Sequence, residues 1–260
     1  MAHITIKDAV VRYPVYSTVR QRSLLSYAAH KASFGRVARE VGHIPVVEAL
    51  RGISLDLKDG DRLALIGRNG SGKTTMLKLC AGLLLPDSGT VVVEGTRAAI
   101  LNPAAGLDPD KTGAENVEQI GRLLSLTKPV RKRLLDDVAD FTELADFLNL
   151  PVRTYSSGMV VRLLFAMATS VERDVLIIDE LIGAGDAHFM EKAATRVHAM
   201  FQRAKVLVVA THAESIVTLL CNRALLLDSG QVVMDAAPQQ VWDVYMGGPA
   251  PIGLTANVSG

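Results

Sequence analysis

Gly67-Arg-Asn-Gly-Ser-Gly-Lys-Thr-Thr75 is the stretch of this 260-residue chain that decides its fold. Its spacing is that of a phosphate-binding loop, in which glycines let the backbone curl so that successive N–H groups point at phosphate oxygens. The apolar run 63–66 before it and the pattern 76–79 after it are typical of the strand and helix that such a loop joins. We expect the phosphates to contact Gly67, Arg68, Asn69, Gly70, Ser71, Gly72, Lys73, Thr74 and Thr75.

Two side chains of this loop give the expected site its chemistry. Lys73 would reach the β- and γ-phosphates, and the Thr74 hydroxyl would ligate Mg²⁺. A helix that begins near Ser71 would add the positive end of its dipole. The alternative is a glycine-rich turn that only joins a strand to a helix. Because both flanks fit, the loop predicts a site for a nucleoside triphosphate.

Composition narrows the class of protein. The formal net charge is +1, which argues against bulk nucleic acid as the main partner. Cys80 and Cys221 lie far apart in apolar segments, so we expect free, buried thiols in a reducing compartment. No apolar run approaches the roughly 20 residues that span a bilayer, and the start of the chain lacks a signal-peptide pattern. We expect a cytosolic protein that could dock on a membrane partner.

Two adjacent acidic residues follow another apolar strand pattern. The run Val175–Ile178 is followed directly by Asp179 and Glu180, at the strand end where ligands collect in open α/β sheets. Asp179 would hold Mg²⁺, directly or through a water, and Glu180 would point at the water that attacks the γ-phosphorus. The alternative is a pair of solvated acids, and the phosphate loop makes that interpretation much weaker.

A histidine follows the next predicted strand. His212 comes just after the apolar run 206–210, again at the carboxyl end of a strand. Many single histidines only make structural hydrogen bonds. At a γ-phosphate, however, the imidazole could hold the attacking water and the carboxylate in line.

Tyr155-Ser-Ser-Gly-Met159 directly precedes a strongly helical pattern. Hydroxyls and a glycine at a helix N-terminus make an anion site, although the same residues also serve as an ordinary N-cap. One subunit has no second phosphate for this site. The motif therefore makes sense if it completes the nucleotide pocket of a partner.

The rest of the chain suggests one α/β domain, residues 1–246, with two additions. Thr112-Gly-Ala-Glu115 is a capping box that opens a helical lobe at about 112–170. A basic insertion at about 14–45 has Arg20, Arg22, Lys31, Arg36 and Arg39 against Glu40 within residues 17–43, and it is either a solvated surface helix or an element facing anionic groups. We expect residues 247–260 to be disordered.

This ordered set of motifs resembles the ATP-binding-cassette (ABC) ATPase subunits. The resemblance implies an α/β P-loop NTPase fold with an antiparallel β subdomain and an inserted helical lobe, and a head-to-tail dimer with two ATP molecules between its subunits. Residues 67–75 would be the Walker A loop and 175–180 the Walker B strand, with Glu180 as general base. It further implies signature residues Ser156, Ser157 and Gly158, a D-loop with Asp186, the switch histidine His212, and Tyr13 (or Tyr16) stacked on adenine.

Several departures from the common pattern are similar to the polysaccharide-exporting subfamily. They are the signature variant with Arg162, the run 185–192, the segment 106–116 and the basic insertion. This similarity implies export of a lipid-linked glycan (O-antigen, capsule or teichoic acid). The expected assembly is a homodimer of ATPase subunits with two copies of a separately encoded permease, at the cytoplasmic face of the inner membrane, without nucleic acid.

One expected residue has no clear counterpart. The glutamine that couples Mg²⁺ to the lobe is not evident, and Asn102 is the nearest amide by position. Two other functions stay open: an ABC ATPase for a drug, lipid or small solute, and a soluble ATP-driven clamp on nucleic acid or ribosomes. A GTPase is weaker, because the chain lacks an Asn-Lys-x-Asp motif.

Overall fold

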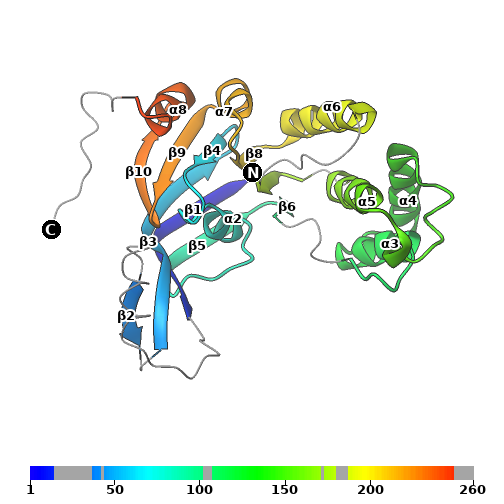
Figure 1. The fold of residues 1–260 in the computed structure, drawn as a ribbon, viewed down its shortest axis with the longest axis horizontal. Helices are drawn as coiled ribbons and strands as arrows, with labels where there is room; N and C mark the ends of the chain where they lie inside the picture. Colours follow the sequence, from blue (N-terminus) through cyan, green and yellow to red (C-terminus); the bar gives the residue numbers. More distant parts are fainter. Residues whose placement is uncertain (15–36, 42–43, 102–106, 171–172, 180–186, 249–260) are drawn as a thin grey trace.

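The computed structural model describes residues 1–14, 37–41, 44–101, 107–170, 173–179 and 187–248. Two sheets pack against each other through one helix, and a helical lobe stands to one side (Figure 1). The strands are β1 (His3–Pro14), β2 (Val37–Val41), β3 (Ile44–Lys58), β4 (Arg62–Ile66), β5 (Ser88–Glu94), β6 (Arg97–Ile100), β7 (Val175–Asp179), β8 (Val206–Ala210), β9 (Arg223–Asp228) and β10 (Gln231–Ala236). The helices are α2 (Lys73–Cys80), α3 (Gly113–Leu123), α4 (Lys128–Thr142), η1 (Val152–Thr154), α5 (Ser157–Thr169), α6 (Ala187–Arg203), α7 (Glu214–Leu220) and α8 (Pro238–Tyr245).

The larger sheet has the strand order β10-β9-β4-β8-β7-β6 among the described residues. Strands β9, β4, β8, β7 and β6 are parallel, and β10 pairs antiparallel with β9. Alternate residues of β7 point to opposite faces: Val175 and Ile177 join the core around α2, whereas Leu176 and Ile178 join the core under α6. Both faces of this sheet are therefore buried, which explains the continuous apolar runs in the sequence.

The smaller sheet is antiparallel, with the order β2-β3-β1-β5. Its inner face, which includes Ile4, Ile6 and Leu57, shares a core with α2 and the larger sheet. An antiparallel sheet packed beside a mainly parallel sheet is the arrangement that the resemblance predicted.

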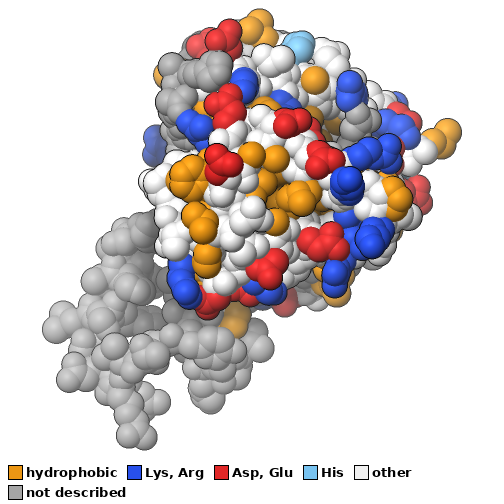
Figure 2. Space-filling model, turned by 90° about the vertical axis from the view of Figure 1, so that its right-hand side faces the viewer, with side chains coloured by type: hydrophobic (Ala, Val, Ile, Leu, Met, Phe, Trp, Pro, Cys, Tyr) orange, Lys and Arg blue, Asp and Glu red, His pale blue; other side chains and the backbone are white. Residues whose placement is uncertain are grey.

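The lobe consists of α3, α4, η1 and α5 around a core of its own, which includes Val117, Val138 and Leu163. The predicted capping box is present: the Thr112 hydroxyl accepts a hydrogen bond from the Glu115 amide at 3.1 Å, and the Glu115 carboxylate accepts one from the Thr112 amide at 2.8 Å. Figure 2 looks onto the molecule from the side of the lobe and shows hydrophobic side chains between charged ones. The exposed large hydrophobic side chains of the lobe are Leu123, Leu124, Phe147 and Leu150.

Some element boundaries differ from expectation. Helix α2 begins at Lys73, two residues later than predicted, because its N-cap Gly72 has a left-handed backbone. The short elements β2, β6 and α7 were not predicted. Of these, β2 is a strand within the basic insertion, for which a surface helix was one expectation. Most of the basic insertion, and residues 249–260, lie outside the described residues.

The structure also bears on the two cysteines and on membrane-spanning helices. Cys80 and Cys221 are free, and burial raises the pKa of each thiol to about 12. No described helix combines the length and the apolar content that a bilayer span requires.

Leu65→Ala tests the strand that leads into the phosphate loop. Leu65 is fully buried, so the truncation leaves a cavity and should lower the free energy of unfolding by about 2–5 kcal/mol. Urea unfolding can be followed by the fluorescence of Trp242, the single tryptophan. Leu219→Ala, at a side chain that is 78% exposed, is the control and should change stability by less than about 0.5 kcal/mol. Equal losses in the two variants would contradict the assigned core.

Candidate functional site

The phosphate loop joins β4 to α2 and is packed tightly against other backbone. A Cβ on Gly67 would lie 2.3 Å from the Leu227 carbonyl oxygen. At Gly72, where φ is +111°, a Cβ would lie 2.8 Å from the Ala49 carbonyl oxygen. Only glycine fits either position, because a side chain would collide with backbone atoms.

Gly230, in the turn between β9 and β10, connects this loop to the smaller sheet. Its amide donates to the Ser71 carbonyl oxygen at 2.9 Å, and its own carbonyl accepts from the Arg51 amide at 2.8 Å. The phosphate loop is therefore bonded to the β9–β10 turn, and this turn is itself bonded to β3. Sequence reasoning did not find Gly230, because its role depends on which segments meet in space.

The Lys73 ammonium lies within the curl of the loop. Its Nζ donates to the Gly67 carbonyl oxygen at 2.5 Å and to the Arg68 carbonyl oxygen at 3.2 Å. Helix α2 has no side-chain cap at its N-terminus, and residues 72–75 at its start line the cavity described below. The loop thus presents one ammonium and a helix N-terminus, which together suit an anion.

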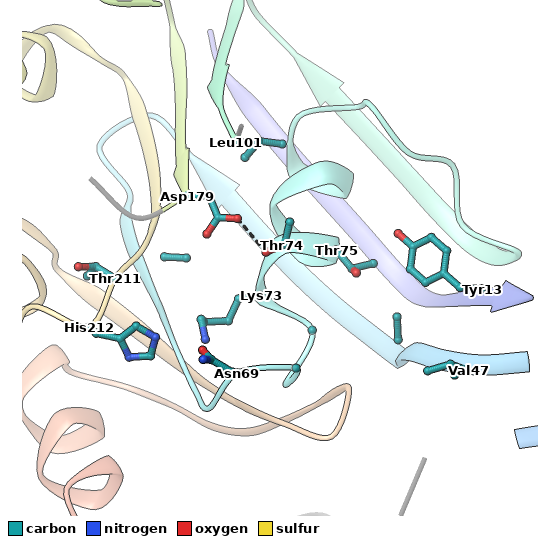
Figure 3. A pocket seen from close by; sticks show the side chains of 14 residues that line it. Tyr13, Val47, Asn69, Lys73, Thr74, Thr75, Leu101, Asp179, Thr211 and His212 are labelled. Atoms are coloured by element: carbon teal, nitrogen blue, oxygen red, sulfur yellow. Dashed lines mark hydrogen bonds between the residues drawn. The ribbon is translucent and has the colours of Figure 1, made fainter. Parts of the chain in front are cut away.

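A cavity of about 550 Å³ opens above the loop (Figure 3). It brings together half of the predicted site residues, from four separate segments: β1, the phosphate loop with the start of α2, the end of β7, and the residues after β8. Its lining is Tyr13, Val47, Ala49, Asn69, Gly70, Gly72, Lys73, Thr74, Thr75, Leu101, Asp179, Ala210, Thr211 and His212.

The predicted residues Gly67, Arg68 and Ser71 shape the loop but do not line this cavity. Ser71 is only 4% exposed, and its amide donates to the Arg68 carbonyl oxygen at 3.0 Å. Val47, Ala49, Leu101, Ala210 and Thr211 line the cavity and were not predicted.

Asp179 and Thr74 meet at the carboxyl end of β7. The Thr74 hydroxyl donates to Asp179 Oδ2 at 2.8 Å, the dashed line in Figure 3. Strands β4 and β7 both pair in parallel with β8. Their carboxyl ends therefore lie on the same side of the sheet, and this brings the two side chains together. A hydroxyl and a carboxylate side by side are oxygen ligands of the kind that Mg²⁺ prefers.

His212 follows β8 and projects into the cavity on the same side as Lys73 (Figure 3). The turn before it is fixed by the Thr211 hydroxyl, which accepts from the Ala213 amide at 3.1 Å. Its Nδ1 lies 3.1 Å from the hydroxyl oxygen of Tyr245, in α8. This contact leaves Nε2 as the ring nitrogen available to the cavity.

Tyr13 stands at the far end of the cavity, at the end of β1. It pairs with Val47 across β1 and β3, and it is 38% exposed. A half-exposed aromatic ring beside an apolar side chain is suited to stacking on a base. The fallback residue, Tyr16, lies outside the described residues.

The motif 155–159 is at a distance from this cavity and lines no part of it. Ser156 is the N-cap of α5, and its hydroxyl accepts from the Met159 amide at 3.3 Å. Ser157 and Gly158 form the first turn of the same helix. Within one chain these residues act as a cap, and a role at a phosphate requires a second chain.

Three predicted site residues, Glu180, Asp186 and Asn102, lie outside the described residues. Their predicted roles stay predictions.

Comparison with known proteins fits this geometry. Residues 50–183 match the family described as ABC transporter. The chain belongs to the ABC transporter family. It is the ATPase subunit of such a transporter, and its reaction is ATP hydrolysis coupled to transport.

Among curated relatives of this ABC subunit are three exporter proteins. The chain is 39% identical to the O-antigen export system ATP-binding protein RfbE of Yersinia enterocolitica, over 89% of this chain and 97% of RfbE. It is 37% identical to RfbB of Myxococcus xanthus, over 92% of this chain and 55% of RfbB. It is 36% identical to the teichoic acids export ATP-binding protein TagH of Bacillus anthracis, over 76% of this chain and 36% of TagH.

Solved structures support the fold of the ABC subunit. The dimeric ATP-binding cassette MJ0796, in a post-hydrolysis state with ADP and Pi, superposes with a TM-score of 0.65 at 20% identity, covering 90% of this chain and 98% of MJ0796. An ATP-binding subunit of an ABC transporter gives a TM-score of 0.69 at 18% identity, covering 94% of this chain and 99% of that one.

Gly72→Ala tests the close approach of the loop to β3. The added methyl group must displace the loop or strain a residue with φ of +111°, so the affinity for a fluorescent ATP analogue should fall more than about tenfold, or about 1.4 kcal/mol. Gly60→Ala is the matched control: φ there is +96°, but nothing lies within 4 Å of the added Cβ and the residue is outside the cavity. Unchanged affinity in Gly72→Ala would contradict the described loop geometry.

Proposed function

We propose that this ATPase subunit powers export of a lipid-linked polysaccharide across the cytoplasmic membrane. The observation that carries the proposal is the likeness to RfbE, named an O-antigen export system ATP-binding protein, over nearly the whole of both chains. TagH, the relative named for export of teichoic acids, supports the same class of cargo, a cell-surface polymer. The signature variant 155–159 with Arg162 supports the same subfamily.

In the proposed mechanism, the phosphates of ATP lie on the loop 67–75. The Lys73 ammonium exchanges its two backbone acceptors for β- and γ-phosphate oxygens, and the amides at the start of α2 bind the same charge. The adenine stacks on Tyr13. These contacts hold the γ-phosphate near the end of β7.

Thr74 and Asp179 fit Mg²⁺, because they place a hydroxyl and a carboxylate oxygen within 2.8 Å of each other beside the phosphate loop. We propose that these two residues hold the ion, Asp179 directly or through a water. When bound, Mg²⁺ neutralises charge on the β- and γ-phosphates. Asn102 is a weaker candidate for the same shell.

Hydrolysis then needs a base and an oriented donor. Glu180, the residue after Asp179, takes a proton from water while the water oxygen forms a bond to the γ-phosphorus and the bond from that phosphorus to the β-phosphate oxygen breaks. His212 donates from Nε2 to a γ-phosphate oxygen and so stabilises the developing charge. ADP and inorganic phosphate are the products.

The complete site, as we propose it, is shared by two subunits. Ser156, Ser157 and Gly158 of one chain would bind the γ-phosphate on the other, and Asp186 would lie near the dimer axis. Two observations favour this assembly: the motif caps a helix whose N-terminus suits an anion, and it does not line the cavity of its own chain. MJ0796, with the same fold, is described as a dimer.

We further propose two copies of a separately encoded permease as partners. The relatives RfbE and TagH are named as ATP-binding proteins of export systems. The lobe carries exposed hydrophobic side chains, including Leu123 and Phe147, at which closure of the dimer could be passed to a membrane partner. The subunit would then be peripheral, at the cytoplasmic face of the bacterial inner membrane.

Gly158→Ala tests whether the motif 156–158 acts on the nucleotide of the partner subunit and not on the nucleotide of its own chain. A Cβ there would have only the Ser156 hydroxyl, at 4.0 Å, as a close neighbour, so the subunit itself should fold and bind ATP within about twofold of wild type. Turnover should fall at least about tenfold if a partner's phosphate approaches this backbone closely, because the added methyl group would hold the phosphate away from the helix N-terminus. Nucleotide titration and steady-state phosphate release measure the two quantities. Wild-type turnover would count against the shared site.

Glu180→Gln tests the base and the cargo together. The amide cannot accept the proton from water, so hydrolysis should fall by about two orders of magnitude or more while ATP affinity is kept. Expressed in the native host, the variant should reduce surface glycan and cause lipid-linked polymer to accumulate inside the cell.

Two results would contradict parts of this proposal. Hydrolysis near the wild-type rate would remove Glu180 as the base. Normal surface glycan in cells with a confirmed ATPase defect would remove polysaccharide as the cargo. Glu191→Gln, at an exposed carboxylate of α6 outside the cavity, is the matched control and should behave as wild type.

A further inference from the structure

The imidazole of His212 has a partner that the reaction itself does not require. Tyr245, the last residue of α8, places its hydroxyl oxygen 3.1 Å from His212 Nδ1. The two rings are also neighbours, with centroids 6.3 Å apart. The contact joins residues 33 positions apart in the chain, so it depends on how α8 is docked.

Helix α8 is docked firmly on the sheet that carries the phosphate loop. Val241 and Trp242 are 0% and 7% exposed and pack in one core with Ala64 and Ile66 of β4, the strand that leads into the loop. The Tyr245 ring lies 5.6 Å from that of Trp242. The Tyr245 hydroxyl is therefore positioned relative to the loop by packing, and not by a long exposed side chain alone.

The hydrogen bond has two possible directions, and only one suits the cavity. If the tyrosine hydroxyl donates to Nδ1, a neutral imidazole carries its proton on Nε2 and offers a donor to the cavity. If Nδ1 carries the proton instead, Nε2 offers a lone pair, which an anionic phosphate oxygen would repel. A donor at Nε2 also matches the loop, where Lys73 and the start of α2 are donors as well.

We propose that Tyr245 is a positioning residue for ATP hydrolysis: it donates to His212 Nδ1, fixes the ring, and keeps the proton on Nε2, where it meets the γ-phosphate. The proposal rests on the proposed role of His212. Through it, the C-terminal helix α8 becomes part of the hydrolytic machinery although it touches no phosphate.

Tyr245→Phe in the full-length subunit is the direct test. The variant keeps the ring and its packing and loses only the hydroxyl. We expect kcat to fall about 10- to 100-fold, as when other partners that orient a histidine are removed, with the KM for ATP within about twofold. Gln239→Ala is the control: it removes an exposed side chain of α8 that bonds to Asp243, keeps the Trp242 packing and the tyrosine hydroxyl, and should leave kcat near wild type.

A spectroscopic readout separates positioning from general stability. In ¹⁵N-histidine-labelled protein, the His212 ring, assigned by loss of its signals in His212→Gln, should show the Nε2–H tautomer in wild type and a mixture in Tyr245→Phe. An Nδ1–H ring in wild type, or an unchanged ring and kcat in Tyr245→Phe, would overturn the proposal.

A double-mutant cycle distinguishes this inference from the function on which it rests. If Tyr245 acts through His212, adding Tyr245→Phe to His212→Gln should cause no further loss of kcat. If His212→Gln alone turns over at the wild-type rate, the role of His212 is wrong. If His212→Gln is impaired but Tyr245→Phe is not, only the positioning role of Tyr245 fails.

Discussion

The site depends on one place where three backbone segments meet without side chains between them. At Gly230, the β9–β10 turn bonds both to Ser71 of the phosphate loop and to Arg51 of β3. Gly72 also lies close to β3: a Cβ added to it would be 2.8 Å from the Ala49 carbonyl oxygen. The smaller sheet therefore fixes the shape of a loop that the larger sheet carries, and both sheets are needed to build one phosphate site.

The remaining site residues are positioned by the parallel register of the larger sheet. Strands β4, β7 and β8 have their carboxyl ends on one side of the sheet, so Thr74, Asp179 and His212 line one cavity although they come from distant parts of the chain. The continuous burial of these strands holds that side rigid. The smaller sheet lines the cavity with Tyr13, Val47 and Ala49. With adenine on Tyr13, as proposed, the smaller sheet would contact the base and the larger sheet would carry the residues that act on the phosphates.

Sequence reasoning found the parts of this site whose residues are set by local chemistry. The loop spacing and the acid after an apolar strand are each complete within a few residues, and Thr74 and Asp179 lie together as expected. The capping box at Thr112, in the lobe, is equally local and is present. Gly230, Val47 and Thr211 were missed because their roles come from segments that meet only in the fold. The late start of α2 had a local cause, the left-handed Gly72, but the sequence does not reveal that conformation.

The two backbone bonds of Lys73 bear on the speed of the transport cycle. The ammonium has acceptors within its own loop, Gly67 and Arg68, so an arriving phosphate exchanges one set of acceptors for another. Such an exchange needs no refolding of the segment and little loss of chain entropy. We therefore expect reloading with ATP to be limited by encounter and not by loop ordering, so that this step does not slow the transport cycle.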